Sequence, residues 1–174
     1  VTIVAACLLG AVNGAIIGFF QVNAFIVTMG MMSISRGLAM TILNSNRVLV
    51  KNSLYNFFGQ ARLLGKIPVS IILVIITGIL AYLVLNHTSF GRRVYAIGGN
   101  PVAARATGIN VRMQTFWTYV LSSVFVGLGA MIIVGRAKSA QPLAGNGFEF
   151  EVITAVVLGG CSLLGGEGRI KGTV

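Results

Sequence analysis

The sequence contains long runs in which no side chain carries a charge. Asp, Glu, Lys and Arg are all missing from residues 1–35, 67–91, 113–135 and 152–166. About 20 apolar residues, each rising 1.5 Å, carry a helix across the hydrocarbon core of a bilayer. The second and third runs therefore suit one crossing each. The first run suits two, because a polar turn at 21–23 interrupts it.

The composition excludes the main alternatives to a membrane protein. Of 174 residues, 56% are hydrophobic and 9% are charged, against roughly 25% charged in an average soluble domain. The high apolar content excludes a disordered chain. Two cysteines, Cys7 and Cys161, are too few for a disulfide-stapled scaffold.

We therefore predict an all-α, polytopic transmembrane bundle. About five spans are expected, at residues 1–20, 25–43, 67–86, 116–135 and 150–166. The last one is short and rich in glycine, which indicates a broken or re-entrant helix buried in protein or lining a cavity. Residues 1–20 lack the basic region of a signal peptide. We expect residues 1–174 to be an internal part of one transmembrane domain, truncated at both ends.

The net charge of +10 does not indicate a nucleic-acid partner. The bases are scattered between apolar spans, with no interleaved aromatic residues, which is typical of Lys and Arg that flank membrane spans. The predicted spans place six bases on one side, namely Arg47, Lys51, Arg62, Lys66, Arg136 and Lys138. The other side also holds six, namely Arg92, Arg93, Arg105, Arg112, Arg169 and Lys171. Loop charge therefore does not determine the orientation.

The first span carries a stripe of small residues. Gly10, Gly14 and Gly18 recur every four residues and so share one helix face, where a second backbone can approach closely. Asn13 lies in the same span, and an amide in hydrocarbon needs polar partners. Asn13 either joins helices or lines a pathway.

Arg36 is the one base inside a predicted span. A helix that starts near Phe25 places Arg36 about 16 Å along its axis, close to mid-membrane. The side chain then faces the bundle interior or a wet cavity, or it snorkels to the interface. Glu149, at the start of the last span, is a candidate partner for its charge.

Residues 88–114 join the third and fourth spans. Gly98-Gly99 is predicted to break any helix, Asn100 to cap a new one and Pro101 to occupy its first position. Gly108 supplies a left-handed stop after Thr107. This pattern predicts a short capped helix outside the membrane, bearing Arg105. Such a helix either docks another protein or lies on the membrane surface.

Three ordered stretches resemble one family. Residues 94–109 resemble the cytoplasmic loop of bacterial ABC permeases that import ribose, galactose, xylose or autoinducer-2, a group related to branched-chain amino-acid permeases. Residues 25–37 and 145–168 resemble two further stretches of the same family. Asn23-Ala24 departs from it, since the family usually has a proline there.

The resemblance implies a permease subunit in the bacterial inner membrane, with residues 88–114 in the cytoplasm. Its partners would be a cytoplasmic ABC ATPase, a periplasmic sugar-binding protein, a second permease copy or homologue, and membrane lipid. ATP and Mg would be bound by the ATPase, with no cofactor on this chain. The coupling segment would comprise Gly98, Gly99, Asn100, Pro101, Arg105 and Gly108.

The residues themselves agree with a non-enzymatic subunit. The sequence has no phosphate-binding loop of the Gly-x-x-x-x-Gly-Lys type, and His87 is its only histidine, too few for a His-based metal site or triad. An ion-coupled carrier and a membrane-embedded enzyme are the alternatives. A carrier typically places acids within its spans, whereas Glu149, Glu151 and Glu167 lie near span ends.

Overall fold

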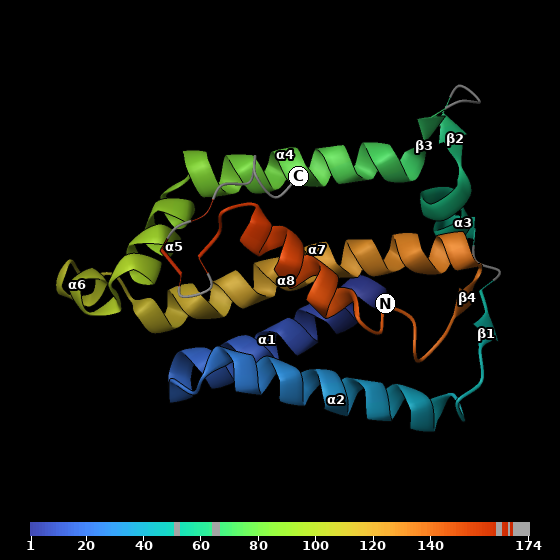
Figure 1. The fold of residues 1–174 in the computed structure, drawn as a ribbon, viewed down its shortest axis with the longest axis horizontal. Helices are drawn as coiled ribbons and strands as arrows, with labels where there is room; N and C mark the ends of the chain where they lie inside the picture. The colour runs from blue at the N-terminus through green and yellow to red at the C-terminus, as the bar shows by residue number, and fades with distance from the viewer. Residues whose placement is uncertain (51–52, 64–66, 163–164, 167, 169–174) are drawn as a thin grey trace. The chain divides into compact units, whose positions relative to one another are not determined.

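The computed structural model describes residues 1–174 except 51–52, 64–66, 163–164, 167 and 169–174 (Figure 1). Its helices are α1 (Thr2–Phe20), α2 (Ala24–Ile42), α3 (Ser53–Gln60), α4 (Val69–His87), α5 (Ser89–Gly99), α6 (Pro101–Ala106), α7 (Val111–Ala137) and α8 (Phe148–Leu158). Its strands are β1 (Val48–Leu49), β2 (Arg62–Leu63), β3 (Ile67–Pro68) and β4 (Ser139–Ala140). Two short antiparallel ladders pair β1 with β4 and β2 with β3. The predicted all-α architecture is confirmed.

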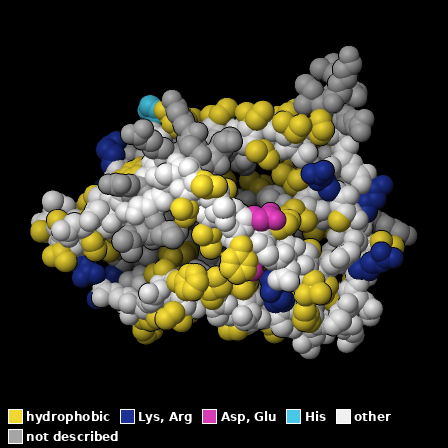
Figure 2. Space-filling model, in the orientation of Figure 1, with side chains coloured by type: hydrophobic (Ala, Val, Ile, Leu, Met, Phe, Trp, Pro, Cys, Tyr) yellow, Lys and Arg dark blue, Asp and Glu magenta, His cyan; other side chains and the backbone are white. Residues whose placement is uncertain are grey.

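Within the described residues, four helices are long and apolar enough to cross a membrane, namely α1, α2, α4 and α7. Their surfaces are apolar, and Figure 2 shows hydrophobic side chains over much of one face of the molecule. Phe25 in α2 and Val126 in α7 are 63% and 68% exposed. Large apolar faces of this kind need lipid or further protein against them. The chain is therefore a multi-pass membrane protein.

The fifth predicted span is shorter than expected. Helix α8 has 11 residues, about 16 Å of rise, and cannot cross a bilayer by itself. Gly160 adopts a left-handed conformation (φ 81°), and the N–H groups of Gly160 and Cys161 close the helix on the carbonyls of Val157 and Val156. The expected break is thus present after Leu158, and residues 163–164 of the predicted span of 150–166 lie outside the described residues. Cys161 lies beyond the end of α8.

The chain divides into two compact units, each described here by itself. Unit 1 comprises residues 1–77 and 116–144, and unit 2 comprises residues 78–115 and 145–174. In unit 1, α1 packs against α2. The turn between them uses Gln21 in a left-handed conformation, and the Asn23 side chain accepts a hydrogen bond from the Phe25 N–H at 2.9 Å. Asn23 therefore caps α2 at the position where a proline was expected from the resemblance.

Candidate functional site

Helix α5, in unit 2, occupies the first half of the segment that follows α4. The Thr88 side chain begins α5 by accepting a hydrogen bond from the Gly91 N–H at 3.3 Å. Gly91 is buried, and a Cβ there would overlap the main chain of Leu85 in α4. Helix α5 was not predicted from the sequence, in which Gly98-Gly99 was expected to break any helix.

Gly98 and Gly99 are in fact the last two residues of α5, which is a correction to the prediction. The direction of the chain changes one residue later, at Asn100, whose backbone is extended (φ −156°, ψ 100°). Because the two glycines lie in the last turn, their low helix propensity weakens only the end of α5 and not its interior. The helix therefore persists to Gly99 and stops at the cap of the next helix.

The missing side chains of this pair allow a close contact with a distant part of unit 2. A Cβ on Gly98 would lie 2.8 Å from the Gly166 Cα, and a Cβ on Gly166 would lie 2.8 Å from the Gly99 Cα. Gly165 and Gly166 are both left-handed, with φ 92° and 80°. We call this backbone packing of 98–99 against 165–166 the glycine contact. Beside it, the Tyr95 hydroxyl donates a hydrogen bond to the Gly168 carbonyl at 3.2 Å.

Helix α6 has the two ends that its sequence predicted. The Asn100 Oδ1 accepts hydrogen bonds from the N–H groups of Val102 and Ala103, both at 3.0 Å, with Pro101 at the first helical position. At the other end Gly108 is left-handed (φ 83°). The Gly108 N–H donates to the Arg105 carbonyl, and the Ile109 N–H donates to the Ala104 carbonyl. These two bonds form a Schellman motif, so both helix ends are satisfied without outside partners.

One side of α6 packs against the rest of unit 2, and its other side is exposed. Ala104 is 4% exposed and anchors the helix, whereas Val102 is 75% exposed. Arg105 and Arg112 are exposed and flank an open hollow of about 420 Å³. The remaining lining residues are Gly108, Ile109, Asn110 and Val111. The surface therefore offers an apolar side chain and two guanidinium groups at fixed positions.

Helix α7 begins beside α5 and is tied to it. The Asn110 side chain accepts a hydrogen bond from the Met113 N–H at 3.1 Å. The Gln114 side chain is 8% exposed, and its amide donates to the Phe90 carbonyl in α5 at 3.1 Å. Helix α7 continues as a candidate membrane span, so this hydrogen bond joins α5 to the first turn of that span.

In unit 1, the face formed by Gly10, Gly14 and Gly18 is buried, and it packs against α7. A Cβ on Gly14 would lie 2.8 Å from the Phe116 carbonyl oxygen. A Cβ on Gly10 would lie 2.9 Å from the Tyr119 carbonyl oxygen. A similar approach joins α3 to α7, where a Cβ on Gly59 would lie 2.6 Å from the Gly135 Cα.

The three intramembrane polar candidates are not brought together within one unit. Asn13 and Arg36 belong to unit 1 and Glu149 belongs to unit 2, so the proposed pairing of Arg36 with Glu149 stays a prediction. The buried Asn13 Oδ1 has no hydrogen-bond partner among the described residues. The Glu149 carboxylate accepts a hydrogen bond from the Gly147 N–H at 3.0 Å.

Comparison with known proteins identifies the family. The model for the permease component of branched-chain amino-acid transport systems matches residues 1–174. The chain belongs to this family. It is 43% identical over 170 residues to the ribose import permease protein RbsC of Escherichia coli, covering 95% of this chain and 53% of that protein. No solved structure matches it.

Other curated relatives carry different sugars in their names. The D-allose transport system permease protein AlsC of Escherichia coli is 35% identical, covering 95% of this chain and 51% of its own length. The L-arabinose transport system permease protein AraH of Escherichia coli is 39% identical, and the match covers 92% of this chain and 48% of AraH. The chain thus spans about half the length of the curated relatives it matches.

Proposed function

We propose that this chain is part of the membrane-spanning permease subunit of an ATP-driven sugar importer in the bacterial inner membrane. The observation that carries the proposal is the 43% identity to a ribose import permease over 95% of this chain, together with a capped, exposed helix between two membrane spans. An ion-coupled carrier typically places acids within its spans. None of residues 1–144 is Asp or Glu, which favours an importer driven by a partner.

In this proposal residues 88–114 lie in the cytoplasm and α6 couples the permease to an ABC ATPase. Asn100, Pro101 and Gly108 fix the length and ends of the helix, and Arg105 and Val102 contact the ATPase. The glycine contact and the Gln114 bond transmit displacement of α6 to the spans. ATP and Mg are bound by the ATPase, so this subunit needs no cofactor of its own.

Two further partners complete the proposed importer. A periplasmic sugar-binding protein delivers the substrate, and a second copy of the permease, or a homologue, forms the other half of the pathway. Asn13 and Arg36 are candidates for lining that pathway. The sugar belongs to the class of pentoses and hexoses named in the relatives, which include ribose, allose and arabinose.

Charge reversal at Arg105 tests the coupling role. We expect Arg105→Glu in the full-length permease to leave the protein folded in the membrane, because this side chain is exposed. Association with the ATPase should fall about tenfold or more, since like charges across an interface are strongly unfavourable. Co-purification of the ATPase and uptake of labelled sugar are the measurements. Arg47→Glu, an equal charge change outside this segment, should leave co-purification intact.

Substitution at Gly108 tests the same role through helix geometry. No atom of the described residues lies within 4 Å of a Gly108 Cβ, so Gly108→Val acts through the backbone conformation. A β-branched residue disfavours the left-handed stop by about 1–2 kcal/mol and displaces Ile109. ATPase co-purification should fall as it does for Arg105→Glu. Normal co-purification and uptake in both variants would contradict a coupling role for α6.

A further inference from the structure

A polar hollow in unit 1 lies where α3, the start of α4 and the end of α7 meet (Figure 1). The Val69 N–H donates to the Ala61 carbonyl at 2.9 Å and so ties the start of α4 to the end of α3. The close approach of Gly59 to Gly135 ties α3 to α7. We call this space of about 450 Å³ the α3 hollow, and its lining residues are Gly59, Gln60, Pro68, Ser70, Ile71 and Arg136.

The polar side chains of the α3 hollow are suited to an anion. Arg136 offers a guanidinium group, Gln60 an amide and Ser70 a hydroxyl, all of which can donate hydrogen bonds. Among the described residues, none of these three side chains has a hydrogen-bond or ion-pair partner. The sequence of unit 1 contains no Asp or Glu that could neutralise Arg136. A guanidinium group beside two further donors is a typical arrangement for binding a phosphate.

The α3 hollow lies at the depth of the lipid headgroups. Arg136 is the first charged residue after the charge-free run of 113–135, and Ser70 belongs to the first turn of the α4 span. Helix α3 adds Tyr55, a residue type that is enriched at the membrane–water interface, and its hydroxyl is hydrogen-bonded to that of Thr2 at the start of α1. A membrane that surrounds these spans therefore brings phosphate groups to the level of the hollow.

An apolar face of α4 leads from the α3 hollow toward the middle of the membrane. Ile71 lines the hollow, and Val74 and Ile75 follow one turn later on the same helix face. The three side chains are 52%, 58% and 55% exposed. We call them the α4 strip. A soluble phosphate would contact only the donors in the hollow, whereas a phospholipid contacts both the donors and the α4 strip.

We propose that the α3 hollow binds the phosphate of an anionic phospholipid, with one acyl chain lying along the α4 strip. Arg136 neutralises the phosphate, and Gln60 and Ser70 donate hydrogen bonds to its oxygens. Because unit 1 has no acid to pair with an ammonium headgroup, phosphatidylglycerol is favoured over phosphatidylethanolamine. The bound lipid joins the first turn of α4 to the last turn of α7. This site requires only a membrane protein and does not depend on the importer function.

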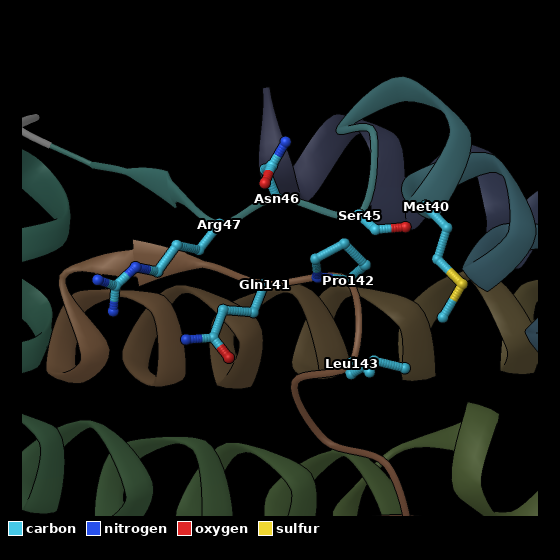
Figure 3. A pocket seen from close by; sticks show the side chains of 7 residues that line it. All are labelled: Met40, Ser45, Asn46, Arg47, Gln141, Pro142 and Leu143. Carbon is cyan, nitrogen blue, oxygen red and sulfur yellow. The ribbon is translucent and has the colours of Figure 1, made fainter.

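A hollow at the end of α2 supplies the matched control. It has a volume of about 330 Å³, and its lining residues are Met40, Ser45, Asn46, Arg47, Gln141, Pro142 and Leu143 (Figure 3). The Arg47 side chain extends away from Met40 and Leu143, so charge and apolar groups do not follow one path there. Arg47 is exposed and lies beyond the end of a span, as Arg136 does. Its removal changes the net charge equally without altering the α3 hollow.

The test measures lipid affinity with the delipidated full-length permease in mild detergent. A ligand that binds the folded state raises the thermal midpoint as its concentration rises. Dioleoyl-phosphatidylglycerol should bind the wild type more tightly than dioleoyl-phosphatidylcholine, which has the same acyl chains. Arg136→Gln should weaken phosphatidylglycerol binding about tenfold or more, because it removes a charge-assisted hydrogen bond, and Ser70→Ala should weaken it about threefold. Arg47→Gln should bind as the wild type does.

Four results would overturn the lipid site. They are equal wild-type affinity for the two lipids, wild-type phosphatidylglycerol affinity in Arg136→Gln, an equal loss of affinity in Arg47→Gln, and stabilisation by glycerol 3-phosphate as strong as that by the lipid. The last result would show a site for a soluble anion. If Arg136→Gln does not fold, Arg136→Lys decides, because a lysine keeps the charge but loses the planar guanidinium and should bind more weakly. Wild-type affinity in Arg136→Lys and Ser70→Ala would then overturn the site. None of these measurements involves sugar, so their failure leaves the importer function untouched.

Discussion

In the proposed importer, replacing Gly98 with alanine is expected to reduce sugar import by the full-length permease about tenfold or more while the protein stays in the membrane. The new methyl group would lie 2.8 Å from the Gly166 Cα and would overlap other main-chain atoms, which cannot rotate away as a side chain can. Such overpacking typically destabilises by 1–3 kcal/mol, here by forcing α5 and the 165–166 turn apart. A displacement worth about 1.4 kcal/mol at the coupling step already reduces transport about tenfold. Uptake of labelled sugar and co-purification of the ATPase measure the effect.

The adjacent glycine provides the control for this prediction. A Cβ on Gly99 meets no atom of the described residues within 4 Å, and the residue is helical. Gly99→Ala should therefore import sugar at the wild-type rate and favour the end of α5 by up to about 1 kcal/mol. If Gly98→Ala and Gly99→Ala change sugar uptake and ATPase co-purification equally, in either direction, the glycine contact has no part in coupling.

The sequence was most informative where structure depends on neighbouring residues. The ends of α6 follow from Asn100, Pro101 and Gly108, because a cap is formed by residues within one helical turn. The four spans follow from the charge-free runs, because the membrane imposes one length and one polarity on any crossing helix. Family membership could also be predicted, since its characteristic stretches are contiguous in the chain.

The sequence was least informative where contacts join distant residues. Gly98 meets Gly166, 68 positions later, so nothing near Gly98 indicates that its missing side chain makes room for another backbone. From its neighbours alone, Gly98-Gly99 indicated a helix break, so α5 was not predicted. Likewise β1 and β4 are two residues long, and their pairing depends on where α2 and α7 end rather than on strand-forming sequence. The pairing of β1 with β4 could therefore be recognised only from the structure.

Replacing Gly14 with leucine should prevent α1 from packing on α7. A Cβ at this position already lies 2.8 Å from the Phe116 carbonyl oxygen and 3.1 Å from the Phe116 Cα, so a branched side chain has no room. In a bilayer, close backbone approach is a main source of helix association, because lipid removes the hydrophobic drive. We expect destabilisation of about 3 kcal/mol or more, a large share of the 5–15 kcal/mol that typically holds a domain together. The measurements are the amount of full-length permease extracted as a monodisperse species and its thermal midpoint in detergent.

The same glycine face allows a graded version of this experiment. Gly14→Ala adds one methyl group against main-chain atoms, whereas Gly129→Ala adds one on a face of α7 where no described atom lies within 4 Å. The thermal midpoint should fall for Gly14→Ala and remain unchanged or rise for Gly129→Ala, because alanine also favours the helix. Leucine at position 14 should lower the midpoint further than alanine does. A wild-type midpoint with leucine at this position would mean that the face meets lipid in the assembled permease, and that α1 is held to α7 by other residues.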